Sequence, residues 1–262
     1  MDFAGKRVLV TGGTRGIGRA AVEGFLAAGA RVALNGKTRA STDAAVAELG
    51  AGERVVAAPG DIGAVEDCRK VVDAALDGLG GLDVLVNNAG AGKVASVEKT
   101  EEELWDRLLG INLKGAFFCT KFALPALRAS KGNVVNVASI FGMRGNGRGS
   151  AAYSASKGGL INLTRELALE LGPDVRVNCL CPGAVDTDML QTIGRYVGLG
   201  DVEAGYSVMA QATPLKRVAK PAEMANVILF LASDLASFVT GSIYMADGGS
   251  HVGIPEGGRS GG

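Results

Sequence analysis

The segment Thr11–Gly18 has the composition of a turn that binds phosphate. It follows the short apolar run Arg7–Val10 directly and runs straight into a helical pattern. A turn without Cβ atoms between a strand and a helix lets a pyrophosphate lie against backbone N–H groups at the positive end of the helix. This context makes the motif more specific than a glycine triplet alone, for which a plain tight turn is the alternative. We therefore predict nucleotide contacts at Gly12, Thr14, Arg15, Gly16, Ile17 and Gly18.

The end of the second apolar run, Arg31–Leu34, carries bases where NAD-binding sheets carry an acid. In those sheets a carboxylate accepts a hydrogen bond from the ribose 2′-hydroxyl. Here the chain continues Asn35-Gly36-Lys37-Thr38-Arg39, without a carboxylate. A carboxylate would repel a 2′-phosphate, whereas Lys37, Arg39 and the nearby Arg15 would pair with it. The sequence favours NADP, that is NADPH, over NAD, and ordinary solvated loop charges are the alternative.

The inventory of nucleophiles and metal ligands excludes other chemistries. The chain has one histidine, His251, near its C-terminus, so we see no plausible Ser-His-acid triad and do not favour a hydrolase. Cys179 and Cys181 invite a metal interpretation, but a thiolate site needs further ligands at suitable spacing. Small buried thiols at the end of an apolar strand are the better interpretation. We predict no metal site.

Overall composition sets the class of protein. The 262 residues suffice for one α/β domain with a sizeable core. Lys plus Arg and Asp plus Glu both total 27, so neither nucleic acid nor an anionic membrane is a favoured partner. The sequence contains no apolar run of the roughly 20 residues that span a bilayer, and its start does not resemble a signal peptide. Four cysteines are too few for a disulfide scaffold, and we expect a cytoplasmic location.

Short apolar runs alternate with longer amphipathic segments along the chain. Near-continuous apolar runs are typical of parallel strands that are covered on both faces. The predicted strands are Arg7–Val10, Arg31–Leu34, Arg54–Ala58, Leu82–Val86, Asn133–Val137, Val175–Leu180 and Ser242–Met245. The predicted helices are Arg19–Ala28, Ala64–Leu79, Glu101–Ser130, Ala155–Leu171 and Pro221–Ser233. This order predicts one Rossmann-type, doubly wound α/β domain over residues 1–250, with a seven-stranded parallel sheet and helices on both faces.

Two regions break the alternation. Residues 186–213 are long, polar and rich in Met, Tyr and Gly, and we predict that they form a substrate lid. Residues 251–262 are glycine-rich towards their end, and we predict a flexible tail.

Several further motifs follow the glycine turn in a fixed order and spacing. They are Asp61-Ile62, Asn87-Asn88-Ala89-Gly90, Asn112, Ser139, Tyr153-Ser154-Ala155-Ser156-Lys157, and Pro182-Gly183 with the downstream Thr187. Because all of these motifs agree in order and spacing, the chain specifically resembles the short-chain dehydrogenase/reductase family from Lys6 to about Gly249. The resemblance is to the 3-oxoacyl-(acyl-carrier-protein) reductases and their relatives that act on sugars, polyols and cyclic or aromatic ketones.

The resemblance implies a catalytic role for four residues. Tyr153 would be the general acid or base at the substrate oxygen, Ser139 would hydrogen-bond that oxygen, and Lys157 would tune Tyr153 and hold the nicotinamide ribose. Tyr153 and Lys157 are four residues apart and share a helix face, so we expect the ammonium, together with the positive nicotinamide, to lower the pKa of the phenol. Asn112 would hold a water that links Lys157 to solvent.

The resemblance also implies further cofactor contacts and an assembly. Besides the glycine turn, Lys37, Tyr153 and Lys157, they are Asp61, Ile62, Asn88, Ala89, Gly90, Pro182, Gly183, Val185 and Thr187. A homotetramer is implied, with the helices at Glu101–Ser130 and Ala155–Leu171 at one interface.

Three functions remain open at this point. The first is interconversion of a small-molecule ketone and a secondary alcohol. The second is reduction of 3-oxoacyl thioesters on a carrier protein, which the acidic junction Glu170–Asp174 makes a poorer fit. The third is a non-catalytic nucleotide-binding protein, which would usually lack part of the Ser-Tyr-Lys set.

Overall fold

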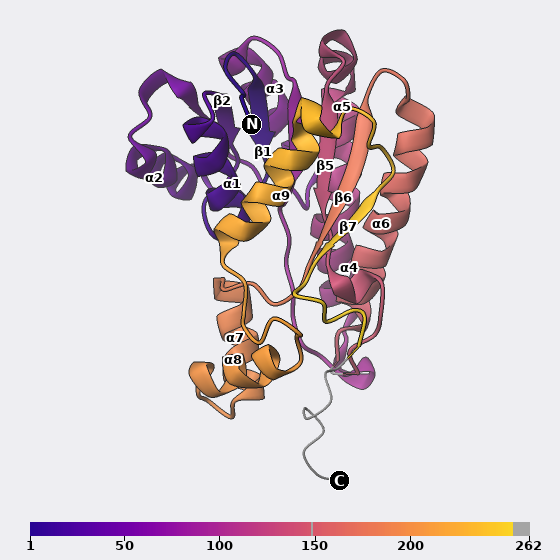
Figure 1. Cartoon of the computed structure of the whole chain (residues 1–262). Helices are drawn as coiled ribbons and strands as arrows, with labels where there is room; N and C mark the ends of the chain where they lie inside the picture. The colour runs from indigo at the N-terminus through magenta and orange to yellow at the C-terminus, as the bar shows by residue number, and fades with distance from the viewer. Residues whose placement is uncertain (148, 254–262) are drawn as a thin grey trace.

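A computed structural model describes residues 1–147 and 149–253 of the chain, so most of the predicted tail, residues 254–262, lies outside the described residues. Its centre is one parallel sheet with the strand order β3-β2-β1-β4-β5-β6-β7 (Figure 1). The strands are β1 (Arg7–Val10), β2 (Arg31–Leu34), β3 (Val55–Ala57), β4 (Val84–Asn87), β5 (Asn133–Val137), β6 (Arg176–Pro182) and β7 (Ile243–Ala246). The predicted seven-stranded, doubly wound sheet is confirmed.

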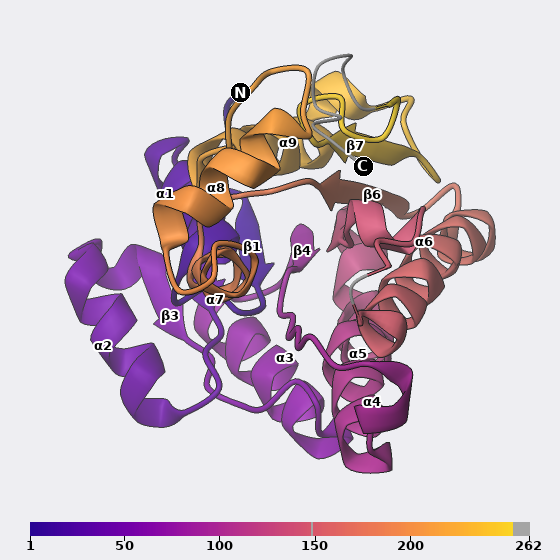
Figure 2. The same cartoon turned by 90° about the horizontal axis from the view of Figure 1, so that it is seen from below.

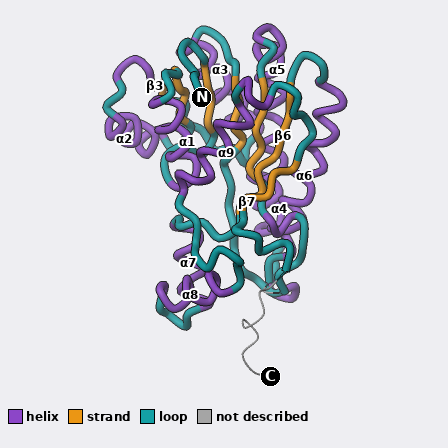
Figure 3. Tube along the Cα trace, viewed as in Figure 1, coloured by secondary structure: helices purple, strands orange, loops and turns teal. Residues whose placement is uncertain are grey.

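Helices cover both faces of this sheet (Figures 1 and 3). One face packs against α1 (Gly16–Ala27), α2 (Arg39–Leu49) and α9 (Pro221–Ala232), and the other against α3 (Val65–Leu79), α5 (Gly115–Ser130) and α6 (Ala151–Leu171). In β1, Val8 and Val10 enter the first core while Leu9 enters the second. Because successive side chains of a strand point to opposite faces, a strand covered on both sides is apolar at most positions.

The long helical pattern from 101 to 130 is interrupted at the predicted catalytic Asn112. Helix α4 (Glu102–Leu109) passes into a π-helical turn, Gly110–Lys114, and then into α5. A π-turn inserts one extra residue into a helix and is frequent at functional sites. The predicted single helix over 101–130 did not include this turn.

Helix α6 begins four residues earlier than predicted, at Ala151, so Tyr153 lies in its first turn. The segment before residue 155 is rich in Gly, Ser and Ala and shows no apolar periodicity, but Ala152 is buried against the rest of the fold. Tertiary packing therefore sets this helix start.

Three helices were not predicted. Helix α2 buries only Thr42 and Ala45, so its apolar face is too narrow to show in the sequence. It is started by a capping box in which Thr38 accepts a hydrogen bond from the backbone of Ser41. The predicted lid contains the other two, α7 (Asp188–Val197) and α8 (Val202–Gln211), which extend beyond the carboxyl ends of the strands at the bottom of Figure 1.

Candidate active site

The loops at the carboxyl ends of the strands bring the predicted site residues to one edge of the sheet. Figure 2 views the molecule from this side, with α7 and α8 nearest the β1–α1 connection and α4 and α6 across from them. Tyr153 and Lys157 come from α6, Ser139 from the end of β5, and Asn112 from the π-turn.

The glycine turn is shaped by close approaches that only glycine permits. Gly12 and Gly16 have φ values of +63° and +56°, where residues with a Cβ are strained. A Cβ at Gly12 would lie 2.9 Å from the Cα of Ala89, and a Cβ at Gly18 would collide with the carbonyl oxygen of Gly12. The β1–α1 turn and the loop after β4 are therefore in backbone contact, as the shared cofactor role predicted for them requires.

Side chains lock these two loops together. The Asn88 side-chain amide donates to the carbonyls of Thr11 and Gly12 at 2.9 and 3.1 Å. The Thr11 hydroxyl oxygen accepts from the backbone N–H groups of Asn88 and Ala89, both at 3.0 Å. Asn88 and Ala89 thus bind the glycine turn directly, a contact that sequence spacing does not show.

The start of α1 fits an anion. Its N-cap residue is Arg15, whose side chain makes no capping hydrogen bond, and no acidic residue stands in the first turn. The first N–H groups of a helix have no partner within the helix, and the helix dipole makes this end positive. The turn and helix start are therefore suited to a pyrophosphate group.

Asn35 is a site residue that the sequence reasoning missed. Its buried side chain accepts from Gly12 N–H at 3.1 Å and donates to the carbonyls of Ala58 and Gly60 at 2.9 and 3.1 Å. It ties the glycine turn to the ends of β2 and β3. The sequence carried one sign of this role, because Asn35 is a polar residue that directly follows an apolar strand and precedes a glycine.

Gly36 has no room for a larger residue. A Cβ at this position would lie 2.6 Å from both Thr14 Cγ2 and Thr42 Oγ1. The packing at the end of β2 therefore leaves no room for an acidic side chain at position 36.

Each of the three bases near the expected ribose position is paired with a carboxylate. Lys37 Nζ lies 2.9 Å from Asp61, and Arg15 lies 3.3 Å from Asp188 at the start of α7. Arg39 pairs with Asp43, one turn along its own helix, at 2.8 Å. The ion pair with Asp43 directs the Arg39 side chain along α2. Asp188, the partner of Arg15, is a second residue of this site that the sequence analysis did not predict.

Asp61 remains ionised next to Lys37. Burial of the carboxyl opposes ionisation, but a hydrogen bond from Gly63 N–H and the charge of Lys37 outweigh it and hold the pKa of Asp61 below its ordinary value. Ile62, the neighbour of Asp61, is buried.

The catalytic candidates converge where β5 meets α6. Lys157 is almost completely buried, and its ammonium donates to the carbonyl of Val137 at 2.8 Å and lies 6.0 Å from the centre of the Tyr153 ring. Desolvation lowers the pKa of Lys157 from 10.5 to about 8, and the neighbouring Cys179 and Cys181 act in the opposite direction. The lysine is thus poised to lose its proton near neutral pH.

Tyr153 differs from the expectation for it. Desolvation of the phenol raises its pKa above the ordinary value, and a hydrogen bond with Ser139 only partly opposes this. In the chain without a nicotinamide, Lys157 therefore does not lower the pKa of Tyr153, and the expected effect of both positive charges together stays a prediction. The physical reason is that the ammonium bonds to the Val137 carbonyl and removal of the phenol from water dominates.

The side chain of Asn112 bonds to other segments of the chain and not to the backbone of its own helix. Its Oδ1 accepts from Ala91 N–H at 2.8 Å, and its Nδ2 donates to the Ala91 carbonyl at 2.9 Å and to Ser156 Oγ at 2.9 Å. Gly90 lies against the same cluster, because a Cβ there would approach Lys157 Nζ and Asn112 Oδ1 at 3.4 and 3.5 Å. The π-turn, the loop after β4 and α6 therefore meet at Asn112.

The segment after β6 connects the sheet to the predicted lid. Gly183 packs against the backbone of Asp247, where a Cβ would lie 2.7 Å away, and Val185 forms an isolated parallel bridge with Ala219. Thr187 caps α7 by accepting from Leu190 N–H at 3.4 Å, and its methyl group lies beside Gly16. Pro182 ends β6, and of the four predicted residues of this segment Thr187 is the one shown in contact with the glycine turn.

Met189 of α7 lies near Tyr153. A Cβ at Gly92 would approach the Met189 sulfur at 3.3 Å and the Tyr153 ring at 3.6 Å, so both side chains flank the same glycine. Tyr206 of α8 is engaged within the predicted lid, where its hydroxyl donates to Asp186 at 2.7 Å.

The interpretation of the cysteines as buried thiols is confirmed. All four are free and buried, and the sulfurs of Cys179 and Cys181 lie 4.0 Å apart. Across residues 1–147 and 149–253, no cluster of three or more His, Cys, Asp or Glu side chains could hold a metal ion. In the same residues no helix has both the length and the apolar character needed to cross a bilayer.

Comparison with known proteins supports the same grouping. Residues 12–251 match a family model described as enoyl-(acyl carrier protein) reductase. The chain is 39% identical over 251 residues to meso-2,3-butanediol dehydrogenase of Serratia marcescens, which covers 95% of this chain and 96% of the relative. It is 36% identical to 3-oxoacyl-(acyl-carrier-protein) reductase of Thermotoga maritima, over 95% of this chain and 99% of the relative.

A solved structure agrees in fold and sequence. It is a short-chain dehydrogenase/reductase, titled glucose/ribitol dehydrogenase, from Brucella melitensis. It superposes with a TM-score of 0.88 at 37% identity and covers 95% of this chain and 99% of its own length.

Proposed function

The chain belongs to the short-chain dehydrogenase/reductase family of oxidoreductases, and we propose that it uses NADP(H) to interconvert a ketone and a secondary alcohol on a small molecule. The observation that carries the proposal is the convergence of Ser139, Tyr153, Lys157 and Asn112 beside an uncapped helix start. A bound nicotinamide supplies or accepts the hydride. The protein's task is to hold the substrate oxygen and move one proton.

Tyr153 is the proton carrier in this proposal. Its raised pKa keeps the phenol protonated at neutral pH, which suits donation to the oxygen of a ketone as that oxygen gains charge. Ser139 hydrogen-bonds the same oxygen and stabilises the developing charge.

Lys157 replaces the proton that Tyr153 gives up. With a pKa of about 8 its ammonium can release a proton at neutral pH at little cost, and it also holds the nicotinamide ribose. Asn112 holds a water beside Lys157 that connects the pair to solvent. Because its side-chain amide is engaged by Ala91 and Ser156, the backbone of the π-turn is the part of Asn112 that is left for this water.

The preference for NADP(H) rests on the end of β2. Gly36 leaves no space for the acid that reads a 2′-hydroxyl, while Arg15 and Lys37 supply two cations within the same region. Initial rates with NADPH and NADH at equal concentration test the preference. A lower KM for NADPH is expected, and a clear preference for NADH would overturn it.

A 3-oxoacyl thioester is the second candidate substrate, supported by the 36% identity to the Thermotoga maritima reductase. Against it, the junction after α6 presents the exposed Glu170 and Asp174, which would repel an acidic carrier protein. A panel of ketones and alcohols, with an acetoacetyl thioester included, separates the two functions at the NADPH absorbance. Higher kcat/KM on the thioester would reverse their order.

A non-catalytic, nucleotide-sensing role is the third candidate. The complete Ser-Tyr-Lys set and the lowered pKa of Lys157 argue against it, because a binding protein needs neither. Turnover of any substrate that Tyr153→Phe abolishes would exclude this role.

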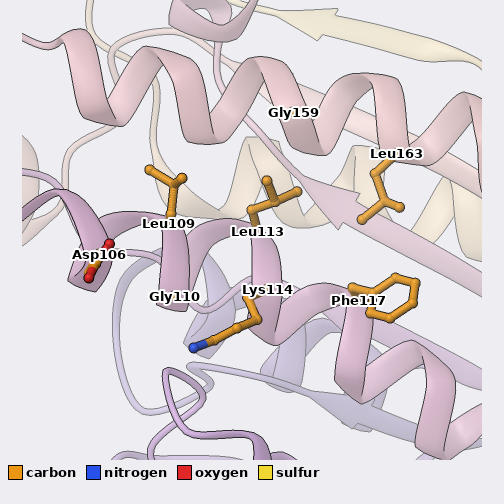
Figure 4. A pocket seen from close by; sticks show the side chains of 8 residues that line it. All are labelled: Asp106, Leu109, Gly110, Leu113, Lys114, Phe117, Gly159 and Leu163. Atoms are coloured by element: carbon orange, nitrogen blue, oxygen red, sulfur yellow. The ribbon is translucent and has the colours of Figure 1, made fainter.

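A homotetramer is part of the proposal. A groove between α4–α5 and α6 is lined by Leu109, Leu113, Phe117 and Leu163, with Asp106, Lys114, Gly110 and Gly159 around them (Figure 4). Phe117 in this groove is 39% exposed and Trp105, on α4, is 40% exposed, which is unusual for large apolar side chains that stay in water. A second copy of the chain that packs the same helices here would bury them. Light scattering tests the assembly, and Phe117→Glu is expected to lower the measured mass.

A further inference from the structure

Helix α6 buries two hydroxyl side chains that make the same pair of hydrogen bonds. Ser156 Oγ donates to the carbonyl of Tyr153 at 2.7 Å and accepts from Asn112 Nδ2 at 2.9 Å. Thr164 Oγ1, about two turns further on, donates to the Leu160 carbonyl at 2.9 Å and accepts from Asn136 Nδ2 at 2.9 Å. Both residues are 0% exposed. The two pairs therefore differ mainly in what surrounds them.

The Ser156 pair lies among the catalytic candidates. Ser156 precedes Lys157, and its hydroxyl bonds to the backbone of Tyr153 itself. Through Asn112 it reaches Ala91, whose N–H and carbonyl are both held by the Asn112 amide. One serine hydroxyl thus connects the first turn of α6, the π-turn and the loop after β4.

The first turn of α6 is fixed by buried contacts, such as that of Ala152, and not by a local cap. Its N-cap residue, Ser150, makes no side-chain capping hydrogen bond, so the start of the helix lacks the usual local anchor. Tyr153 lies in this turn, and a shift of the turn moves the phenol relative to Ser139 and Lys157. The Ser156–Asn112 bond supplies an anchor from inside the protein at the point where a local cap is missing.

We propose that Ser156 is a positioning residue, which sets the place of Tyr153 by tying its helical turn to Asn112 and Ala91. The inference rests on the proposed role of Tyr153 as proton carrier. Ser156 itself has no contact with the proposed substrate oxygen, and its hydroxyl is occupied by the Tyr153 carbonyl and the Asn112 amide.

The test compares Ser156→Ala with Thr164→Val, which removes the matched hydroxyl on the same helix. Misplacement of a reacting group by a fraction of an ångström is costly, so Ser156→Ala is expected to lower kcat about tenfold, with the KM for NADPH changed less than about twofold. The midpoint of the pH profile of kcat should also move by about half a unit or more, because the surroundings of Tyr153 and Lys157 change. Thr164→Val should lower thermal stability and leave kcat and the pH profile unchanged.

A second pair of variants covers the case in which Ser156→Ala does not fold. Ser156→Thr and Ser156→Val have the same shape, and only the first keeps a hydroxyl. The proposal expects kcat to be at least about fivefold higher in the threonine variant than in the valine variant. Equal kcat in the two, or a Ser156→Ala variant that matches Thr164→Val in kcat and pH profile, overturns it.

Tyr153→Phe, measured alongside, separates this inference from the proposed function. If Tyr153→Phe retains turnover, the role of Tyr153 fails. If Tyr153→Phe is inactive and Ser156→Ala keeps the wild-type kcat and pH profile, only the role of Ser156 fails.

Discussion

Arg15 and Asp188, at the ribose end of the proposed cofactor site, form an ion pair with 79% and 66% of their side-chain surfaces exposed. Lys157 and Ser156, at the catalytic end, are 3% and 0% exposed. An exposed ion pair is worth about 0–1 kcal/mol and changes partners easily. A buried polar group that loses its partner costs about 1–3 kcal/mol, so its geometry is fixed. The contrast implies that the proton-transfer apparatus is rigid while cofactor choice is set by weak, competing contacts.

The largest effect is expected at the rigid end. Tyr153→Phe removes the proposed proton carrier together with its hydrogen bond to Ser139, so kcat should fall about 10³-fold. The dissociation constant for NADPH, measured by fluorescence titration, should stay within about twofold because the phenol contributes little to binding. Appreciable turnover in the variant would refute the assignment.

Lys157→Met should abolish activity and raise the free energy of unfolding at pH 7. The pKa of Lys157 falls from 10.5 to about 8 on folding, which corresponds to about 3 kcal/mol of destabilisation at pH 7. Below pH 8 both the folded and unfolded chains hold the proton, and the full penalty applies. Between pH 8 and 10.5 the unfolded chain binds more protons than the folded chain, so wild-type stability rises with pH across this window.

Denaturant unfolding at one fixed protein concentration measures the free energy of unfolding of both proteins at each pH. The methionine variant should be inactive, more stable than wild type at pH 7 by up to about 3 kcal/mol, and close to wild type near pH 10. A variant that is less stable at pH 7 would contradict the view of Lys157 as a buried charge retained for function.

At the exposed Arg15–Asp188 pair we expect a medium effect on KM, which differs between NADPH and NADH. Arg15→Ala removes one charge-assisted contact with a 2′-phosphate, so the KM for NADPH should rise about tenfold. The KM for NADH should stay unchanged, since NADH has no phosphate at that position. Equal changes for both cofactors would place Arg15 at the pyrophosphate instead.

We expect the smallest effect at Asp188, the exposed partner of Arg15. Asp188→Asn frees Arg15 from its exposed partner, so the KM for NADPH should fall, by no more than about fivefold. Asp43→Asn is the matched control, because Asp43 pairs with Arg39 along α2 in a similarly exposed way. An identical response of the two variants would show that the effect comes from net charge and not from competition for Arg15.

The sequence was informative where one physical requirement controlled a segment. Apolar runs placed all seven strands within two residues at each end, because a strand covered on both faces is mostly apolar. It was uninformative for α2, α7 and α8, each of which buries no more than two of its residues, and for the start of α6. The π-turn at Gly110–Lys114 left no trace in the periodicity.

By itself, then, the sequence determined the fold class, the family, and the set of residues that meet at the carboxyl edge of the sheet. Only the tertiary structure decided their electrical state and their attachments. Desolvation, which depends on all the surrounding chain, raised the pKa of Tyr153 and lowered that of Lys157. The bonds from Asn35 to Gly12 and from Ser156 to Asn112 join segments distant in the chain, and residue spacing carries no information about such contacts.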